Sequence, residues 1–318
     1  MCGVFAYLGH QDAVTAVIKG LKKLEYRGYD SSGVAFIEND NLIVIKEAGK
    51  ISVLEGKIKE KSFSTHTAIA HTRWATHGEP CARNAHPHCD KNHTVAVVHN
   101  GVIENYLHIK QNLKDAVFKS DTDTEVVPAL IANLYRRDFL KACIGAFSKL
   151  EGAFALAIIH KDHPNTLIAT AEKSPLVVGY QKTTKETYIA SDPSALAGLD
   201  LDLFFLKDGA ISLLKKGEYP IFYDKMGVRI EVIATHPNML SSDISKGIFP
   251  HFMLKEIFEQ ESSVHTVIKK YTDPLSKQPL FKELPGLKLD FSDIDHITII
   301  ACGTSYNAGL LGYITLSH

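Results

Sequence analysis

The chain opens with CGVFAYLG, residues 2–9, directly behind Met1. Gly3–Leu8 is a short apolar run of the kind that forms a buried strand. Methionine aminopeptidases remove an initiator methionine when the second residue is small, so we expect a mature chain that begins with Cys2. The α-amine of such a residue has an unperturbed pKa of about 7.7–8.0, close enough to neutrality to accept a proton from an attacking thiol. The stretch therefore predicts a nucleophile activated by its own N-terminal amine; if Met1 is retained, this nitrogen is an amide and cannot act as a base.

The composition is that of a globular protein with more than one domain. The chain has 318 residues, 45 % of them apolar and 22 % charged, and this length favours two domains. With 35 basic and 36 acidic residues the net charge is -1, so no basic field is available to hold nucleic acid or a membrane surface. No uninterrupted apolar run approaches the ~18 residues of a membrane span, and the N-terminus lacks the pattern of a signal peptide.

The cysteine and histidine patterns argue against disulfides and metal sites. Five cysteines are few for this length, odd in number and scattered, which favours the reducing cytoplasm. Histidines are dense between His66 and His99, and NAHPHC at 84–89 invites comparison with zinc sites. Its spacing matches none of the paired-ligand patterns. We therefore expect histidines that form hydrogen bonds in the core and loops, with no metal and no other cofactor.

Hydrophobic periodicity predicts alternating short strands and amphipathic helices as far as residue 235. The expected helices cover residues 13–25, the segment from a cap at Asp123 or Thr124 to Leu134, and 139–150. The expected strands cover 33–37, 42–46, 68–71, 95–99, 153–160, 166–171, 176–180, 187–190, 203–206, 210–214 and 221–233. Beyond residue 171 the strands follow one another with little helix between them. This order favours antiparallel pairing and an α+β class with layered sheets.

The remaining chain reads as a linker and the start of another domain. Proline, asparagine, serine and glycine accumulate at 236–250, which indicates a domain boundary, and a helix is expected at 252–270. HITIIA, residues 296–301, predicts a buried strand that leads into Gly303–Ser305 at a helix start. Backbone N–H groups and hydroxyls in such a turn can bind an anion such as phosphate. One strand and one helix cannot close a domain core, so we expect further sequence or a second polypeptide to complete this unit.

Three loops carry side chains suited to amide chemistry. Asn100 and Gly101 follow a predicted strand, and their side-chain and backbone N–H groups can converge on a tetrahedral oxygen. Arg73, in a second loop, can bind a substrate carboxylate through two parallel hydrogen bonds. Asp123 can either cap a helix or receive an α-ammonium group. Together Arg73 and Asp123 would hold the two charges of a free amino acid and leave its side chain facing Cys2.

Eight motifs in a fixed order resemble the glutamine–fructose-6-phosphate aminotransferase (isomerizing) family, also called glucosamine-6-phosphate synthase. They are CGVFAYLG (2–9), LEYRGYDSSG (24–33), AHTRWATHG (70–78), NAHPH (84–88), VHNGVIEN (98–105), SDTDTEV (120–126), KEIFEQ (255–260) and ACGTSYN (301–307). The resemblance implies a glutaminase of the N-terminal-nucleophile hydrolase type, with a four-layer αββα sandwich, at 1–238. It further implies a linker with a helix at 239–290, and the first strand and helix of an α/β sugar isomerase (SIS) domain at 291–318.

The resemblance also implies roles for individual residues. Cys2 would attack the side-chain amide of glutamine, with Asn100 and Gly101 as the oxyanion hole and Arg27 in support of the nucleophile. The glutamine pocket would comprise Arg73, Trp74, Thr76, His77 and Asp123. Trp74 would also act as a gate between the glutaminase and synthase sites. A sugar phosphate would bind at Gly303, Thr304 and Ser305.

The implied reaction is hydrolysis of L-glutamine to glutamate and ammonia through a thioester on Cys2. The ammonia would go to fructose 6-phosphate, giving glucosamine 6-phosphate for amino-sugar biosynthesis. That step needs an isomerase half which this sequence largely lacks and through which a homodimer would form. Two alternatives are the glutaminase part of another amidotransferase, such as amidophosphoribosyltransferase, and a non-catalytic remnant that binds glutamine. ITIIACGTS at 297–305 argues against the first, because that enzyme should continue into a phosphoribosyl-binding domain.

Overall fold

A computed structural model describes residues 2–59, 63–74, 78–236, 246–280, 294–301 and 303–316. The chain divides into two compact units, residues 1–245 and 246–318. The two domain boundaries expected from the sequence, at 238/239 and 290/291, lie outside the described residues and stay predictions.

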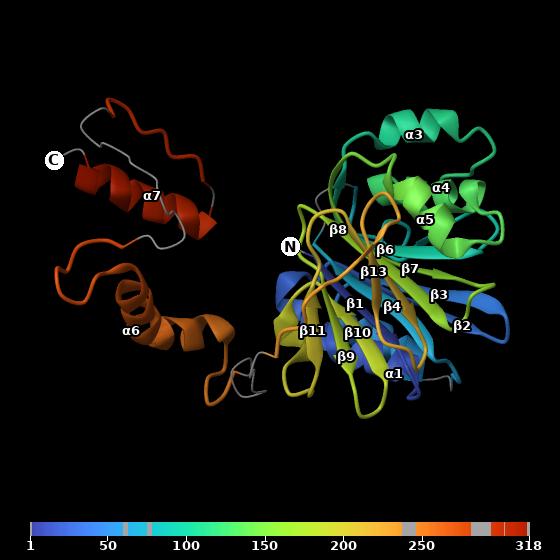
Figure 1. Ribbon diagram of the computed structural model, residues 1–318, viewed down its shortest axis with the longest axis horizontal. Helices are drawn as coiled ribbons and strands as arrows, with labels where there is room; N and C mark the ends of the chain where they lie inside the picture. The colour runs from blue at the N-terminus through green and yellow to red at the C-terminus, as the bar shows by residue number, and fades with distance from the viewer. Residues whose placement is uncertain are drawn as a thin grey trace. The chain divides into compact units, whose positions relative to one another are not determined.

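Within the described residues of the first unit, two seven-stranded antiparallel sheets form the body (Figure 1). The strands of the first sheet, in spatial order, are β11 (Asp202–Phe205), β9 (Val177–Gln181), β10 (Glu186–Ala190), β1 (Gly3–Leu8), β4 (Thr67–Arg73), β2 (Ser31–Glu38) and β3 (Asn41–Ala48). Those of the second sheet are β14 (Arg229–Ile230), β13 (Ile221–Tyr223), β12 (Ala210–Lys215), β8 (Thr166–Glu172), β7 (Gly152–His160), β6 (Val95–Ile103) and β5 (His88–Cys89). Strand β1 is therefore central, with Cys2 immediately before it.

Strand β1 shows how side-chain alternation builds the layers. Val4 and Leu8 belong to the core between the two sheets, whereas Phe5 belongs to the outer core beneath helix α1 (Ala13–Lys22). Successive side chains of a strand point to opposite faces, so an all-apolar strand is buried on both sides. Helix α1 approaches so closely that a Cβ added at Gly20 would lie 2.3 Å from the Phe5 ring.

Helices cover the outer face of each sheet and complete four layers. Helices α1 and α2 (Ile51–Lys59) pack on the first sheet. The second sheet is covered by α3 (Tyr106–Asn112), α4 (Val126–Leu134) and α5 (Phe139–Phe147) (Figure 1). Short 3-10 helices lie in the connections: η1 (Glu25–Arg27), η2 (Asp123–Glu125) and η3 (Pro193–Leu196). The αββα sandwich expected from the sequence is confirmed.

The segment 221–233, expected as one strand, forms the two short strands β13 and β14. Between them the Asp224 carboxylate accepts hydrogen bonds from the backbone N–H groups of Met226 and Val228, both at 2.9 Å. Gly227 completes the turn with a φ of +81°. An aspartate that binds the backbone just after it is a turn signal, and here it ends the first strand.

The described part of the second unit contains the helices α6 (Phe252–Tyr271) and α7 (Gly303–Leu316). The helix expected at 252–270 is confirmed. The buried strand expected at 296–301 is wrong, because these residues are exposed and pair with no strand of the described ranges. An apolar run is buried as a strand only where neighbours satisfy its backbone N–H and C=O groups. None of the helices in the described ranges combines the length and apolar character that a membrane crossing requires.

Candidate active site

The thiol of Cys2 lies next to the backbone that follows β4. Its Sγ is 3.3 Å from the Trp74 nitrogen and 3.5 Å from the Trp74 carbonyl oxygen, because the β1–β4 register pairs Gly3 with Thr72. Burial raises the pKa of the Cys2 thiol, and the hydrogen bond from the Trp74 N–H partly offsets this rise.

Asn100, on β6 in the second sheet, reaches across to Cys2. Its Nδ2 donates a hydrogen bond to the Cys2 carbonyl oxygen at 3.0 Å, and its Oδ1 lies 3.0 Å from His71 Nε2. The next residue, Gly101, has a φ of +129°, and a Cβ there would lie 2.0 Å from the Ala153 carbonyl oxygen, so only glycine fits. The two residues expected to form an oxyanion hole thus lie beside the expected nucleophile.

A small hollow of about 30 Å³ brings residues of both sheets together. Five of its lining residues are ones that the sequence singles out: Cys2, Arg73, Trp74, Gly101 and Asp123. The others are His71, His86, His99, Thr122 and Thr124. The strand ends of the two sheets therefore meet at one place, which local sequence patterns cannot reveal.

Arg73 and Asp123 are the two buried charges of this hollow, with only 4 % and 8 % of their surface exposed. Nη1 of Arg73 donates to the Glu79 carbonyl oxygen at 3.4 Å. The Asp123 carboxylate accepts a hydrogen bond from the Ile103 backbone N–H at 2.6 Å. Because both charges border the hollow, a ligand that carries one positive and one negative group suits this arrangement.

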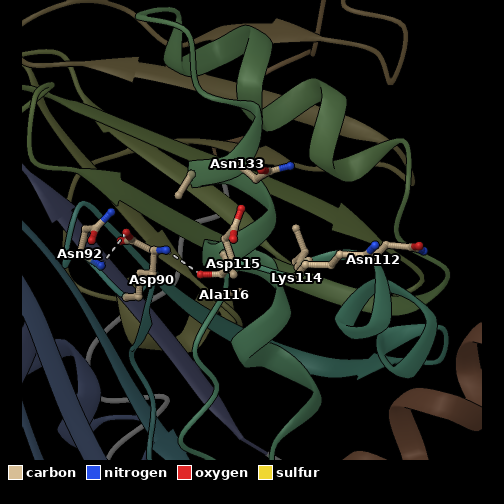
Figure 2. Close-up of a pocket in the computed structure, with 11 residues that line it drawn as sticks. Asp90, Asn92, Asn112, Lys114, Asp115, Ala116 and Asn133 are labelled. Carbon is tan, nitrogen blue, oxygen red and sulfur yellow. Dashed lines mark hydrogen bonds between the residues drawn. The ribbon is translucent and has the colours of Figure 1, made fainter.

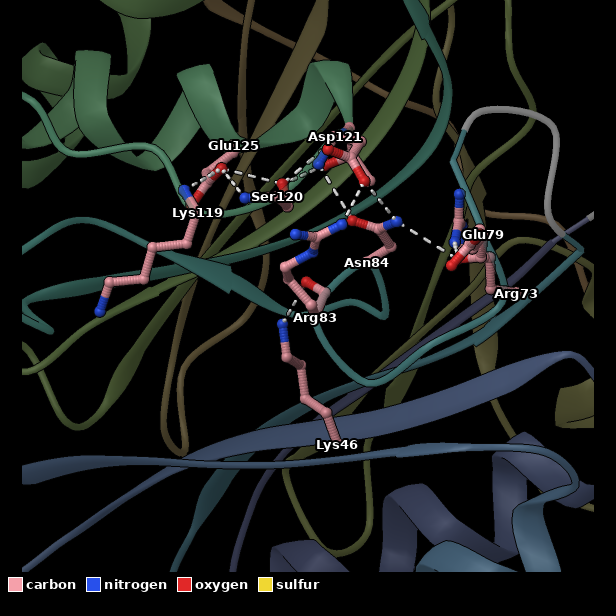
Figure 3. A network of polar contacts seen from close by, with 10 residues as sticks. Lys46, Arg73, Glu79, Arg83, Asn84, Lys119, Ser120, Asp121 and Glu125 are labelled. Atoms are coloured by element: carbon pink, nitrogen blue, oxygen red, sulfur yellow. Dashed lines mark hydrogen bonds and ion pairs between the residues drawn. The ribbon is translucent and has the colours of Figure 1, made fainter.

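A polar network fastens the loop after β4 to the segment that carries Asp123 (Figure 3). Asn84, fully buried, donates to the Glu79 carbonyl oxygen at 3.2 Å and to the Asp121 carboxylate at 3.1 Å. It also accepts a hydrogen bond from the Asp121 backbone N–H at 3.0 Å. Arg83 forms an ion pair with the same carboxylate at 2.7 Å. The two charged ends of the hollow consequently share one scaffold.

Arg27, expected to support the nucleophile, is not among the described residues that line the hollow. It forms an ion pair with Asp192 at 3.4 Å and donates to the Ser191 carbonyl oxygen at 3.3 Å. Ser191 in turn exchanges hydrogen bonds with Val4, each at 3.0 Å. Arg27 therefore reaches strand β1 through Ser191, one step removed from Cys2.

Trp74 lies at the rim of the hollow and is 44 % exposed. Its ring packs edge-to-face against Tyr29, with centroids 5.6 Å apart. Thr76 and His77, expected in the same pocket, lie outside the described residues. In the second unit, α7 begins at Gly303 with a φ of +60°, and the two hydroxyl residues that follow are exposed.

Four buried histidines, to which the sequence analysis assigned no role, form a cluster: His71, His86, His88 and His99. All but His88 line the hollow. The rings of His71 and His86 stack with centroids 4.3 Å apart, and His88 lies edge-on to His86 at 4.8 Å. Burial lowers the pKa of His71 to about 3 and also lowers the pKa values of the other three. A signal was present, because His71 precedes Arg73 by two residues on β4 and alternate strand residues share a face. Within the described ranges, no group of three or more metal-binding side chains is arranged to hold an ion.

A larger hollow, of about 390 Å³, lies between the loop after β5 and helices α3 and α4 (Figure 2). Its described lining includes no cysteine, serine, threonine or histidine. The Asp90 carboxylate accepts hydrogen bonds from the backbone N–H groups of Asn92, Thr94 and Val95, at between 2.6 and 3.0 Å. The backbone of its own loop therefore satisfies the Asp90 carboxylate. With no nucleophile in its described lining, this hollow lacks the reactive groups of the Cys2 site.

Comparison with known proteins shows similarity to glutamine amidotransferases. Residues 71–198 match the family model of the glutamine amidotransferase domain. The glutamine–fructose-6-phosphate aminotransferase [isomerizing] of Clostridium acetobutylicum is 40 % identical over 98 % of this chain and 51 % of its own length. That of Aquifex aeolicus is 44 % identical over the same shares. The chain is a relative of these aminotransferases. It spans about half the length of the curated relatives it matches.

Solved structures support the same fold. A glutamine phosphoribosylpyrophosphate amidotransferase from B. subtilis superposes with a TM-score of 0.61 and 24 % identity, over 70 % of this chain and 49 % of that one. A glutamine aminotransferase class-II domain protein from Silicibacter pomeroyi has a TM-score of 0.50 and 16 % identity, over 70 % of this chain and 99 % of that one. At these identities the likeness shows the fold alone.

Proposed function

We propose that this chain hydrolyses L-glutamine to glutamate and ammonia, with Cys2 as the nucleophile. The observation that supports the proposal is the convergence of a thiol, a buried guanidinium and a buried carboxylate on one hollow. Arg73 would bind the α-carboxylate of glutamine and Asp123 its α-ammonium group. The side-chain amide would then lie toward Cys2.

The thiol needs a base, and the neighbouring histidines are unsuited to that role. The pKa of Cys2 is raised by burial, so its proton must leave as the sulfur attacks. Burial lowers the pKa of His71 to about 3, which makes it a poor proton acceptor. Among the described residues, the hydrogen-bond partners of Sγ are the backbone atoms of Trp74. The α-amine that Cys2 gains when Met1 is removed is the base that fits.

The reaction would proceed in two steps, formation of a thioester on Cys2 and its hydrolysis. Sγ of Cys2 forms a bond to the amide carbon of glutamine, and its proton passes through the α-amine to the leaving nitrogen, which departs as ammonia. Water then attacks the resulting thioester, which releases glutamate and restores the thiol. The negative oxygen formed in each step would accept hydrogen bonds from Asn100 Nδ2 and the Gly101 backbone N–H.

Glutamine needs more room than this conformation offers. A hollow of about 30 Å³ has space on the scale of one or two water molecules. Binding therefore requires side chains at the rim to move, and Trp74, which is 44 % exposed there, is the side chain we expect to cover bound glutamine.

The acceptor of the ammonia is proposed from the relatives, whose names specify fructose 6-phosphate. A sugar phosphate would bind at Gly303, Thr304 and Ser305, where α7 offers hydroxyls and the positive end of a helix. Because the chain spans about half the length of these relatives, full aminotransferase activity is not expected of these residues alone. The homodimer expected through the isomerase half stays a prediction. The described cysteines are all free, which supports the expected cytoplasmic location.

Glutamate release by the purified chain, with Met1 removed, tests the proposal. Cys2→Ala should abolish release, whereas Cys81→Ala, which alters another free cysteine outside the hollow, should leave it unchanged. Absence of release from the processed chain, despite proper folding, would favour the non-catalytic remnant.

A further inference from the structure

The Asn100 side chain can take either of two orientations, and only one serves an oxyanion. An amide presents two N–H donors on one side and an acceptor oxygen on the other. In the observed orientation Nδ2 faces the Cys2 carbonyl oxygen and Oδ1 faces His71 Nε2, both at 3.0 Å. Turned over, Asn100 would aim its carbonyl oxygen at another oxygen and at the developing negative charge. Asn100 can therefore serve as an oxyanion donor only if neighbouring groups hold its side chain in the observed orientation.

His71 presents the matching proton to Asn100. A neutral imidazole carries one N–H and one lone pair, and Oδ1 of Asn100 can only accept, so the proton lies on Nε2. Complete burial keeps the ring neutral, since it lowers the pKa of His71 to about 3. The pairing of donor and acceptor thus fixes one tautomer together with one amide orientation.

The plane of the His71 ring is fixed from the opposite side. It stacks on the His86 ring, with centroids 4.3 Å apart. His86 is itself held, because its Nδ1 accepts a hydrogen bond from the His99 backbone N–H at 3.3 Å. Its Nε2 also lies 3.4 Å from Thr124 Oγ1. The stack therefore prevents the imidazole from turning away from Asn100.

We propose that His71 is a positioning residue for glutamine hydrolysis, which directs the N–H groups of Asn100 toward the carbonyl that Cys2 attacks. The inference rests on the proposed function and adds to it a residue that contacts neither the sulfur nor the charged ends of the substrate. Arg73 and Asp123 would still bind glutamine without it. Loss of His71 should consequently lower kcat and leave KM nearly unchanged.

Three variants separate positioning from packing. His71→Leu keeps much of the volume and removes the donor. His71→Gln places an amide N–H near the position of Nε2 and restores the donor. His88→Leu is the matched control, because His88 is buried in the same cluster and bonds Thr122 Oγ1 at 3.0 Å rather than Asn100.

His71→Leu should lower kcat for glutamine about tenfold to a hundredfold, somewhat less than loss of an oxyanion donor itself costs, with KM within about twofold. His71→Gln should recover most of kcat, and His88→Leu should keep it within about threefold. A His71→Leu variant with the kcat of the parent chain would overturn the inference. So would a His71→Gln variant as impaired as His71→Leu.

A spectroscopic measurement on the unsubstituted chain covers the case in which a variant fails to fold. Long-range ¹H–¹⁵N spectra of protein labelled with ¹⁵N in its histidine rings, at pH 7, should show His71 in the Nε2-protonated form. The His71 signals are assigned as those absent from the spectrum of His71→Gln. The Nδ1-protonated form would overturn the inference. If the parent chain releases no glutamate, glutamine hydrolysis fails, and the tautomer still decides whether His71 holds Asn100.

Discussion

Two apolar stretches of similar pattern have opposite fates in this chain. GVFAYL, Gly3–Leu8, is buried at every residue and lies between β10 and β4. HITIIA, 296–301, is exposed throughout, and Ile300 is 93 % exposed. The first stretch has a strand on each side to satisfy its backbone, and the second has none among the described residues. A hydrophobic run therefore predicts a buried strand only together with its neighbours.

The candidate sites inherit this difference. The Cys2 hollow is lined mainly by residues of β4, β6 and η2, and strand pairing and the Asn84 network hold these elements in place. The expected phosphate loop at Gly303 opens an exposed helix. Preorganised chemistry is accordingly expected in the first unit.

Replacing isoleucine by alanine in each region should give the largest contrast. Ile69 on β4 is fully buried between the sheets, so Ile69→Ala should lower the free energy of unfolding by about 2–5 kcal/mol. Ile300→Ala should change it by less than about 0.5 kcal/mol. Urea unfolding, followed by far-UV circular dichroism, which reports on both units, measures both. Equal losses would mean that 296–301 is packed in solution.

Two arginines from neighbouring segments sharpen the contrast between buried and exposed charge. Arg73→Ala should weaken glutamine binding by about 2–3 kcal/mol, because the bidentate hydrogen bonds between the guanidinium and the substrate carboxylate are lost. The Arg83 side chain is 56 % exposed, so Arg83→Ala should weaken glutamine binding by less than about 1 kcal/mol. The Michaelis constant for glutamine is the measurement. An unchanged value for Arg73→Ala would show that the substrate carboxylate binds elsewhere.

The buried histidines should make the first unit sensitive to acid. Because burial lowers the pKa of His71 to about 3 in the folded state, only the unfolded chain binds its proton as the pH falls from about 6.5. Stability is thus unaffected above that pH and declines below it, by about 1.4 kcal/mol per pH unit for each such histidine. Urea unfolding between pH 7 and pH 5 checks this. In His71→Gln the free energy of unfolding should fall less steeply with decreasing pH, by about the 1.4 kcal/mol per pH unit that one histidine contributes. An unaltered dependence on pH would contradict the burial of a neutral His71 ring.

Local pattern alone predicts much of the fold. The strand expected at 153–160 is β7, Gly152–His160, since its apolar residues need no distant information to be recognised. The prediction of one strand at 221–233 was wrong because the hydrogen bonds of Asp224 end the strand there. The prediction of a buried strand at 296–301 was wrong because no described strand pairs with it. The first error reflects a local turn signal that hydrophobic periodicity overlooks. The second concerns neighbouring strands, which periodicity does not encode.

The family motifs predicted the residues of the candidate site, but their local structure differs from the prediction. Arg73, Asn100 and Gly101 were expected in loops after strands, whereas Arg73 is the last residue of β4 and the other two lie within β6. The contact between His71 and Asn100 joins different sheets, and the stack with His86 depends on how those sheets pack. Sequence spacing places His71 on the same face of β4 as Arg73, but it does not reveal these two contacts, which only the three-dimensional structure shows.

The most direct measurement compares the chain with and without Met1 after exposure to an electrophilic analogue of glutamine. Mass mapping should find the analogue on Cys2 of the processed chain, with labelling suppressed by excess glutamine, and little or none on the chain that keeps Met1. Equal labelling of both chains, or labelling of another cysteine in place of Cys2, would contradict a nucleophile activated by its own amine.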